Sequence, residues 1–302
     1  MIKVNFFEDN IEECVLALGF FDAVHRGHVR VLSTCVALAK ELETVPVAFT
    51  FDCNPSNFVK DKDDKLICSY SERLDRFSDI GIKKVLSAPC EKKFFDIKPI
   101  DFLDFLRDRF HAKGIVCGYD YRFGAGGVGD VAYLKEYCEK NGIILRLVDE
   151  LRESDQKIGS SNIKEFIKSG LIEKANSFLG YNYFVSGKVL SGRGDGKKLV
   201  VPTVNLSMPN DKVVPKRGVY YTLVKVDEIV YKGLTNVGAH PTFCDNNENV
   251  ETFILDFNGD LYGKTIRVEF VSFLREIEKF STPQELREQI IKDELKVRSA
   301  KW

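Results

Sequence analysis

The stretch VLALGFFDAVHRGH, residues 15–28, decides how the first half of this chain folds. Its apolar part, Val15–Phe20, is typical of a buried β-strand. Two histidines follow, His25 and His28, and the helical spacing of apolar residues begins at Gly27. Two of the four histidines in the chain therefore lie where a predicted strand ends and a predicted helix starts.

The same alternation of strand and helix patterns continues through the first half. Strand-like runs lie at Val45–Phe51, Lys84–Ser87, Gly114–Cys117 and Ile143–Val148, and helical patterns lie at Gly27–Leu42, Ile100–Phe110 and Val131–Lys140. Ser69 and Glu72 have the spacing of a capping box and begin another helix. This α/β alternation predicts a Rossmann-like parallel sheet with helices on both faces. Ligands bind such sheets beyond the carboxyl ends of the strands, where the paired histidines lie.

The pattern changes near residue 180, after two short helical patterns. These are Asn162–Ser169 and Ile172–Leu179, and the strand-like runs beyond them are Tyr183–Leu190, Gly218–Val226, Ile229–Val237, Val250–Phe257 and Thr265–Phe273. Turns rich in Gly and Asn separate the runs, which predicts a compact antiparallel β-barrel. Thr282, Pro283 and Glu285 have the pattern of a helix start and predict a C-terminal helix. We therefore predict two domains, 1–180 and 181–302.

Composition excludes several classes of function. The net charge is −1, and acids are interspersed with bases, so we expect no nucleic-acid partner. No apolar run approaches the roughly 20 residues that cross a bilayer, so we expect no membrane partner. Acidic residues near the N-terminus argue against a signal peptide, which predicts a cytoplasmic protein. The eight cysteines form no CxxC pair, and we interpret them as small buried apolar residues. Nothing in the sequence indicates an oligomeric state.

The histidine pair has three interpretations. A zinc site would need further ligands, and His111 and His240 stand in no metal-ligand motif, which disfavours zinc. A helix start offers free backbone N–H groups and the positive end of the helix dipole, so it suits phosphate. The alternative is a pair of helix-start histidines with no ligand. The phosphate interpretation is favoured because Gly19, Asp22 and Gly27 surround the pair.

Several motifs of the first half resemble those of one enzyme family. GFFDAVHRGH resembles the GxFDGxHxGH signature of nucleotidylyltransferases. TFDCNPS (50–56), GYDYRFGAGGVGD (118–130) and IGSSNIKEF (158–166) resemble the TFDPHP, GxDFRFGxxxxGD and ISSTxIR stretches of bacterial bifunctional riboflavin kinase/FAD synthetases, in the same order. The resemblance implies that the first domain joins FMN to ATP, forming FAD and pyrophosphate.

The resemblance also implies roles for individual residues. His25 and His28 would hold the ATP phosphates as the α-phosphate is attacked. Further ATP contacts are implied for Gly19, Phe21, Asp22, Gly27, Ser160, Ser161 and Lys164, and flavin contacts for Asn54, Asp120, Arg122 and Phe123.

The chain departs from the family pattern at several positions. Ala23 replaces a Gly, Asn54 replaces a His, Gly159 and Ser161 alter the ISST stretch, and Lys164 stands where Arg is usual. These departures motivate an alternative function, a riboflavin kinase whose adenylyltransferase half is impaired or altered. A flavin-binding sensor without turnover is a third hypothesis, which the candidate catalytic residues of the second half disfavour.

The second half carries its own candidate site in SGRGDGKKLVVPTVNL, residues 191–206. Gly192, Gly196 and Lys197 lie in a glycine-rich turn that suits ATP phosphates. Thr203 and Asn205 are two apart on an extended segment, so they face the same side, and their oxygens suit Mg²⁺.

This half resembles the riboflavin kinase module of the same family. The matching stretches are PTVN (202–205), GVY (218–220), NVGAHPTF (236–243) and VETFILDF (250–257). The resemblance implies that Glu251 is the base that accepts the proton of the riboflavin 5′-hydroxyl, and that Arg275 contacts the flavin. Strand alternation places Glu251, Phe253 and Leu255 on one side, which we expect to face into the barrel. The implied enzyme phosphorylates riboflavin to FMN and then adenylylates FMN to FAD.

Overall fold

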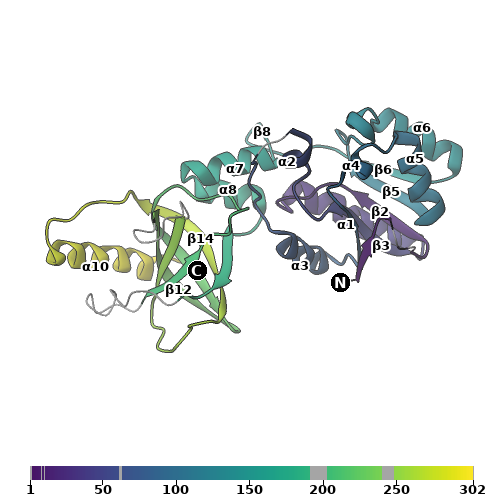
Figure 1. Ribbon diagram of the computed structural model, residues 1–302. Helices are drawn as coiled ribbons and strands as arrows, with labels where there is room; N and C mark the ends of the chain where they lie inside the picture. Colours follow the sequence, from purple (N-terminus) through teal and green to yellow (C-terminus); the bar gives the residue numbers. More distant parts are fainter. Residues whose placement is uncertain are drawn as a thin grey trace. The chain divides into compact units, whose positions relative to one another are not determined.

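The computed structural model describes residues 2–7, 9, 11–60, 63–190, 203–239 and 248–301 (Figure 1). The chain divides into two compact units, Met1–Ser160 and Ser161–Trp302. The glycine-rich turn with Gly192, Gly196 and Lys197, and most of the CDNNEN turn, lie outside the described residues.

The first unit contains a parallel sheet, as the sequence predicts, although one of its six strands, Ile2–Asn5, was not predicted. Its strands are β1 (Ile2–Asn5), β2 (Cys14–Leu18), β3 (Val45–Phe51), β4 (Lys84–Ala88), β5 (Ala112–Gly118) and β6 (Ile144–Val148). They lie in the order β1-β4-β3-β2-β5-β6. Strand β2 pairs with β3 on one side and with β5 on the other, so the chain reverses its direction of winding there. The carboxyl end of β2 is thus the place where such sheets bind ligands.

Helices cover both faces of this sheet (Figure 1). Helices α1 (Arg26–Glu41) and α3 (Tyr70–Ile80) pack on one face, and α4 (Lys92–Phe95), α5 (Pro99–Asp104), the π-helix η1 (Phe105–Arg109) and α6 (Val131–Asn141) pack on the other. The short elements are α2 (Pro55–Lys60), the 3₁₀ turn η2 (Ala125–Gly127) and the hairpin β7 (Arg152–Glu153) and β8 (Gln156–Lys157). The capping box that we predict at Ser69 and Glu72 is confirmed at the start of α3.

Phenylalanine rings fill the core under α4 and α5. Phe6 is fully buried, and its ring centroid lies 5.0 Å from that of Phe94, 6.0 Å from that of Phe102 and 5.5 Å from that of Phe110. Burial of each such ring contributes about 2 kcal/mol to stability. The core therefore fastens the outer helices to the sheet whose strand ends carry the candidate site.

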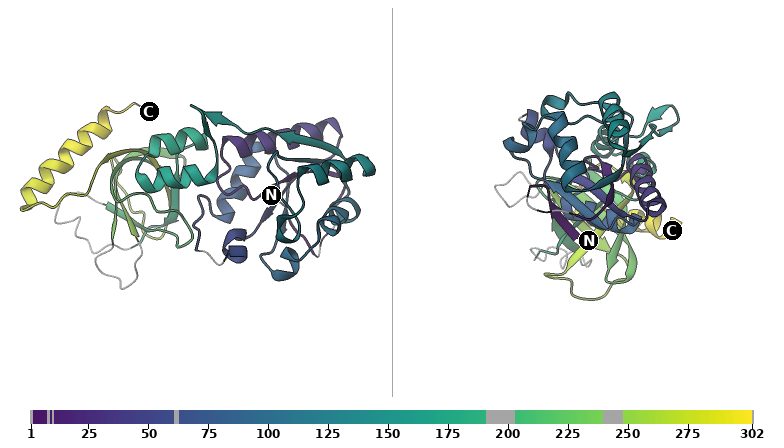
Figure 2. Two further views of the ribbon diagram at one scale, coloured as in Figure 1. Left: turned by 90° about the horizontal axis from the view of Figure 1, so that it is seen from above. Right: turned by 90° about the vertical axis from the view of Figure 1, so that its right-hand side faces the viewer.

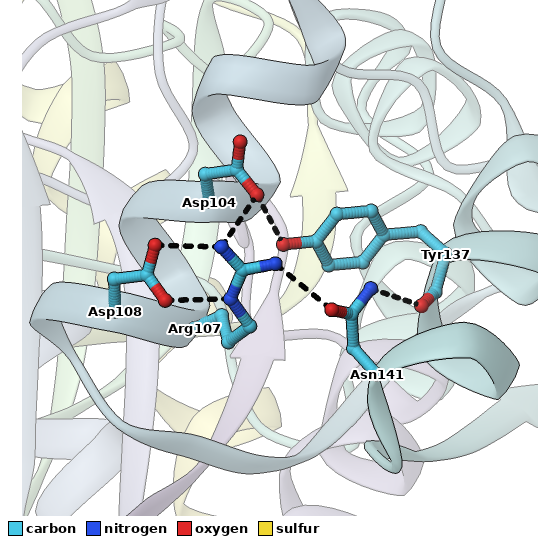
Figure 3. A network of polar contacts seen from close by, with 5 residues as sticks. All are labelled: Asp104, Arg107, Asp108, Tyr137 and Asn141. Carbon is cyan, nitrogen blue, oxygen red and sulfur yellow. Dashed lines mark hydrogen bonds and ion pairs between the residues drawn. The ribbon is translucent and has the colours of Figure 1, made fainter.

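A polar network links η1 to α6 (Figure 3). The Arg107 guanidinium donates to both carboxylate oxygens of Asp108 and to Asn141 Oδ1, the last at 2.8 Å. The Tyr137 hydroxyl donates to Asp104 Oδ1 at 2.6 Å. The single helix that we predict over Ile100–Phe110 is therefore an α-helix that continues as a π-helix, and the π-helical turn presents Arg107 to this network.

The interpretation of the cysteines is correct for five and wrong for two. Those at 14, 35, 68, 117 and 138 are buried and free. Cys53 and Cys90 are only partly buried and form a disulfide, with their Cα atoms 6.2 Å apart. The sequence could not show this pair, because its members are 37 positions apart and only the strand register brings them together.

The second unit is a curled antiparallel sheet. Its strands are β9 (Phe184–Lys188), β10 (Thr203–Ser207), β11 (Gly218–Val226), β12 (Ile229–Ala239), β13 (Glu248–Ile254) and β14 (Thr265–Arg275), in the order β10-β13-β12-β11-β14-β9. The backbone N–H of Leu190 donates to the carbonyl of Asn205 at 2.9 Å and joins the two edges of the sheet. The predicted barrel is therefore confirmed, and helix α10 (Pro283–Ser299) lies outside the curled sheet (Figure 2).

The start of α10 follows the predicted pattern with one difference. Thr282 is the N-cap, and its hydroxyl accepts from the Glu285 backbone N–H at 3.2 Å. The Glu285 carboxylate accepts from the Ser281 N–H and not from that of Thr282. The helix start is thus satisfied by both side chains, although the reciprocal capping box is shifted by one residue.

Two faces of the barrel sheet carry different side chains. The hydroxyls of Thr222, Thr235 and Thr252 form a fully buried chain with O–O distances of 2.8 Å on the inner face. Glu251 and Phe253 alternate with Thr252, so they lie on the other face, where Phe253 packs against a hydrophobic cluster that includes Val297 of α10. The expectation that Glu251 points into the barrel is therefore wrong, because the apolar neighbours of its face belong to the contact with the C-terminal helix.

The helix pair before the barrel packs against it. Helices α7 (Ser160–Ser169) and α8 (Ile172–Leu179) match the predicted pair closely. The Lys216 backbone N–H donates to the carbonyl of Ile167 at 3.2 Å, and the Asn176 side chain donates to the carbonyl of Phe270 at 2.8 Å. By these contacts α8 and nearly all of α7 belong to the second unit. The boundary of the catalytic domains near residue 180 stays a prediction.

Candidate active sites

The loop after β2 is compact and strained. Phe21 and Val24 have φ angles of 56° and 44°, which bulky residues rarely adopt. A Cβ on Gly19 would lie 2.7 Å from the Phe21 ring, so only glycine lets this ring fold back onto the end of the strand. The loop that precedes the histidines therefore holds a conformation that its sequence would not favour alone, as is common at functional sites.

The two histidines stack at the start of α1. His25 is the N-cap of the helix, and its Nδ1 accepts from the His28 backbone N–H at 3.2 Å. The ring centroids lie 3.6 Å apart. A Cβ on Gly27 would lie 3.1 Å from the His25 ring, so this glycine makes room for the stack. The pair is thus positioned by helix capping and by ring packing together.

Both imidazoles are neutral near pH 7. Burial lowers the pKa of His25 to about 4, and the positive charge of Lys157 acts in the same direction. Burial also lowers the pKa of His28 well below its ordinary value, and His25 and Arg73 add to the decrease. Because His25 Nδ1 accepts a hydrogen bond, the proton of the neutral ring is on Nε2, which can donate to a ligand.

Arg73 of α3 fixes the ends of two neighbouring strands, a role that was not predicted from the sequence. Its guanidinium is fully buried, and Nη1 donates to the Phe20 carbonyl at 2.9 Å and to Thr50 Oγ1 at 2.8 Å. Nη2 donates to the Phe51 carbonyl at 2.9 Å. The only signal in the sequence is that Arg73 follows a capping box, which does not distinguish it from a surface arginine.

Asp22 and Asn54 hold loops in place. Asp22 is buried, and its Oδ1 accepts from the Ile67 backbone N–H at 2.9 Å. The Asn54 amide oxygen accepts from the Ser56 backbone and hydroxyl, and its nitrogen donates to the Asp64 carbonyl at 2.7 Å. Both residues shape the carboxyl edge of the sheet, and their contacts with ATP and flavin stay predictions.

The predicted flavin residues after β5 lie in different environments. Asp120 forms an ion pair with Lys157 at 2.7 Å. Arg122 is largely exposed and lies 3.8 Å from Asp130, the N-cap of α6. Phe123 is 5% exposed and packs in the aromatic core. Asp120 and Arg122 can thus reach a ligand, whereas the Phe123 ring can do so only if the core opens.

Ser160 and Ser161 lie in the first turn of α7, and Lys164 lies one turn later. The segment that leads to α7 passes the start of α1, because a Cβ on Gly27 would lie 3.9 Å from the Ile158 carbonyl oxygen. Helix α7 therefore begins two residues beyond the point where the chain passes Gly27.

The second unit assembles a polar cluster from three strands. Thr203 Oγ1 donates to Glu251 Oε1 at 2.8 Å. Glu251 is paired in register with Asn205 of β10 and with Asn236 of β12. Asn205 Oδ1 in turn accepts from Asn249 Nδ2 at 2.8 Å. Asn236 and Asn249 were not predicted as members, because only the strand register places them beside Glu251.

A pocket of about 150 Å³ adjoins this cluster. Its lining includes Thr203 and the turn Phe257–Tyr262. Arg275, the last residue of β14, donates to Asp293 of α10 at 2.8 Å. The guanidinium thus fastens α10 to the sheet, and its predicted flavin contact stays a prediction.

The two units define two classes of site. The first is a doubly wound α/β sheet with neutral imidazoles at a helix start, which suits the binding of a nucleotide's phosphates. The second is a β-barrel with a carboxylate hydrogen bonded to a hydroxyl, beside amide oxygens, which suits phosphoryl transfer to an alcohol.

Comparison with known proteins assigns both units. The family model described as FAD synthetase matches residues 7–162, and the model described as riboflavin kinase matches residues 179–301. The chain is 33% identical to the bifunctional riboflavin kinase/FMN adenylyltransferase of Bacillus subtilis (strain 168), over 92% of this chain and 90% of the relative. It is 30% identical to the enzyme of the same name from Listeria monocytogenes serovar 1/2a, over 94% and 91%. The chain belongs to the bifunctional riboflavin kinase/FMN adenylyltransferase family.

A solved structure shares the whole fold. The crystal structure titled as a macrolide-efflux protein from Streptococcus pneumoniae superposes with a TM-score of 0.92 and covers 100% of both chains at 25% identity. In the described part of this chain, no helix combines the length and the apolar character that a membrane span requires.

The alternative of an impaired adenylyltransferase half gains no support. Ala23, which replaces a family glycine, is not among the residues with positive φ, so the alanine fits the backbone. A Cβ on Gly159 would meet nothing within 4 Å, so no neighbouring atom lies close enough for the side chain at this position to affect packing. The FAD synthetase model also matches across the departures up to residue 162. The chain is therefore an enzyme with both a riboflavin kinase and an FMN adenylyltransferase domain.

Proposed function

We propose that residues 1–180 adenylylate FMN through His25 and His28, and that residues 181–302 phosphorylate riboflavin through Glu251. The observation that carries the proposal is that each family match contains a preorganised polar cluster suited to its reaction: the stacked, neutral histidines in the first, and the Thr203–Glu251 hydrogen bond in the second. The two reactions then need different residues and can be lost separately.

In the adenylyltransferase half, positioning and charge stabilisation are enough for catalysis. The phosphate of FMN is already an anion, so its attack on the α-phosphate of ATP needs no strong base. The Nε2–H of neutral His25 and a ring N–H of His28 donate hydrogen bonds to phosphate oxygens as negative charge builds up there. The free N–H groups at the start of α1 act in the same direction.

The remaining predicted ATP residues support this reaction. Gly19, Phe21 and Gly27 shape the strand-end loop and the histidine stack, and Asp22 holds the neighbouring loop. Ser160, Ser161 and Lys164 stand at a second helix start and offer hydroxyl and ammonium donors for phosphate. Asn54, Asp120, Arg122 and Phe123 are proposed for the flavin side.

In the kinase half, Glu251 accepts the proton of the riboflavin 5′-hydroxyl as that oxygen attacks the γ-phosphate of ATP. The Thr203 hydroxyl orients the carboxylate by its hydrogen bond to Oε1, which leaves Oε2 to face the substrate. Gly192, Gly196 and Lys197 are proposed for the ATP phosphates, and Arg275 for the flavin.

The polar cluster of the second unit fits Mg²⁺. The Thr203 hydroxyl, the Asn205 amide oxygen and the Glu251 carboxylate are hard oxygen donors, and their hydrogen-bond partners in the described part of the chain bring in only further oxygen and amide groups. Thr203 and Asn205 would hold the ion together with the ATP phosphates. When bound, Mg²⁺ neutralises phosphate charge during transfer.

A time course tests the proposed function. The protein is incubated with riboflavin, ATP and Mg²⁺, and the flavins are separated by chromatography. We expect FMN first and FAD later. FMN without FAD, also when FMN is supplied directly, would contradict the assignment of the first half. The cytoplasmic location and the lack of a nucleic-acid partner stay predictions from composition.

A further inference from the structure

Cys53 and Cys90 lie at the carboxyl edge of the sheet, where we place the flavin. Strands β3 and β4 run in parallel and end in register, at the pair Phe51 and Ala88. Each cysteine stands two residues beyond its own strand end. The register therefore brings the two sulfurs together, and they are joined as a disulfide.

The pair differs from the other cysteines that the structure describes. Those at 14, 35, 68, 117 and 138 are buried, and burial raises the pKa of Cys138 to about 11 and those of Cys35 and Cys117 to about 12. Such thiols rarely ionise near pH 7 and are inert. Cys53 and Cys90 are partly exposed and lie in loops, so solutes can reach them.

The disulfide ties together two segments at this edge. Cys53 directly precedes Asn54, whose amide closes the loop that surrounds α2. Cys90 lies two residues before α4, the helix that ends with Phe95. The Phe95 ring stacks on that of Phe58 in α2, with centroids 4.8 Å apart. Opening the disulfide removes this covalent cross-link and leaves the two segments joined by side-chain packing.

We propose that Cys53 and Cys90 form a reversible thiol–disulfide modification site that sets the affinity of the adenylyltransferase half for FMN. This inference rests on the proposed function, since it needs FMN to bind at this edge. The disulfide holds the two loops in one arrangement, so the oxidised protein loses less conformational freedom when FMN binds. The reduced protein must order these loops and binds FMN more weakly.

The chemistry is exchange with a small-molecule disulfide. One protein thiolate attacks the small disulfide, forms a mixed disulfide and releases one small thiolate, which takes up the proton lost from the protein thiol. The second protein thiolate then attacks the protein sulfur of the mixed disulfide and releases the second small thiolate, which is protonated likewise. Two electrons pass from the protein dithiol to the small disulfide, and two small thiols are formed.

Asp52 sets the expected rate of this exchange. A carboxylate oxygen of Asp52 and the sulfur atoms of Cys53 and Cys90 all lie within 4.8 Å of one another. A negative charge so close opposes formation of a thiolate. We therefore expect exchange to be slow near neutral pH and the Asp52→Asn variant to exchange faster.

Thiol mapping and kinetics on the full-length protein test the proposal together. The protein is equilibrated in mixtures of oxidised and reduced glutathione, free thiols are alkylated, and the two cysteines are mapped by mass spectrometry. We expect both to change together from alkylated to protected as the mixture becomes oxidising. We expect the KM for FMN to rise about three- to tenfold on reduction, with riboflavin phosphorylation in the same samples unchanged.

Variants make the test specific. The Cys53→Ser and Cys90→Ser variants should each show the KM of the reduced protein in every mixture, and Cys138→Ser should respond as the intact protein does. An unchanged KM in fully oxidised and fully reduced samples would overturn the proposal. A stoichiometric zinc ion that protects both reduced thiols from alkylation would also overturn it, since Asp52, Cys53 and Cys90 would then form a metal site. Absence of FAD in both states would count against the proposed function instead, because the thiol mapping does not depend on activity.

Discussion

The two candidate sites are built in different ways. The histidine site comes from one continuous loop, in which helix capping and ring stacking position His25 and His28 within four residues. The carboxylate site comes from three strands, and only their register brings Thr203, Glu251 and Asn236 to one place. A site that lies within one local motif can therefore be interpreted from the sequence, whereas a site made by strand register needs the structure.

The sites also differ in charge. The first holds two imidazoles that burial keeps neutral, so they are suited to donate hydrogen bonds to a ligand that brings its own charge. The second holds a half-buried carboxylate that accepts a hydrogen bond from a hydroxyl. An attacking phosphate needs no base, and an attacking alcohol does, which matches these two arrangements to the two reactions.

Glu251→Gln should have the largest effect. The amide cannot accept the hydroxyl proton, so we expect riboflavin phosphorylation to fall about 10²- to 10⁴-fold. Adenylylation of supplied FMN should not change. Glu228→Gln is a matched control, because Glu228 lies in an exposed turn of the same unit. Steady-state assays of both reactions measure the effect, and turnover near that of the control would contradict the role of the base.

His28→Asn should have the next largest effect, in the other half. Loss of a positioned donor to the phosphates should lower adenylylation about 10²- to 10³-fold and leave riboflavin phosphorylation intact. His111→Asn is the control, since His111 is exposed and has a φ of 46°, which asparagine tolerates. Equal losses of both activities would show that the sites are not separable.

Arg73→Met should destabilise the first half by about 4 kcal/mol, because the carbonyls of Phe20 and Phe51 and the Thr50 hydroxyl lose a buried donor. Adenylylation should fall with it, since these groups form the strand ends beside the histidines. Thermal unfolding followed by circular dichroism measures the change. Arg30→Met, on the exposed side of α1, should shift the transition little. A change no larger than this control would contradict the positioning role of Arg73.

The smallest predicted effect is a dependence of stability on pH. The unfolded chain protonates His25 near pH 6.5, whereas the folded chain does so only near pH 4. The unfolded state thus binds more protons between these values, and stability falls as the pH falls. From pH 6.5 to 5.5 we expect a loss of about 1 kcal/mol from this residue. Denaturant titrations at several pH values give the free energy of unfolding. In the His25→Asn variant, which keeps a helix-capping side chain, this free energy should fall less steeply between pH 6.5 and 5.5 than in the intact protein. An equally steep fall would contradict the neutral, buried imidazole.

Much of the fold could be predicted from the sequence. Local signals were sufficient for the capping box at Ser69, for the strand Val45–Phe51 and for the helix Ile172–Leu179, whose bounds the structure reproduces. These features depend on residues within a few positions of one another, so neighbouring side chains determine them.

The remaining features depend on contacts between distant residues. The disulfide between Cys53 and Cys90, the burial of Arg73 and the face on which Glu251 lies all follow from strand register or helix packing. Strand alternation predicted correctly that Glu251 and Phe253 share a face. It could not tell which face was the inner one, because the outer face is also made apolar by its contact with α10.

Mixing two inactivated variants tests most directly whether the two sites work independently. His28→Asn and Glu251→Gln are each incubated with riboflavin, ATP and Mg²⁺, alone and together, and FAD is measured by chromatography. Neither variant alone should make appreciable FAD, since each lacks one reaction. The mixture should make FAD after a lag, because FMN released by the first variant is the substrate of the second. A mixture that accumulates FMN and no FAD, although the Glu251→Gln variant adenylylates supplied FMN, would contradict this account.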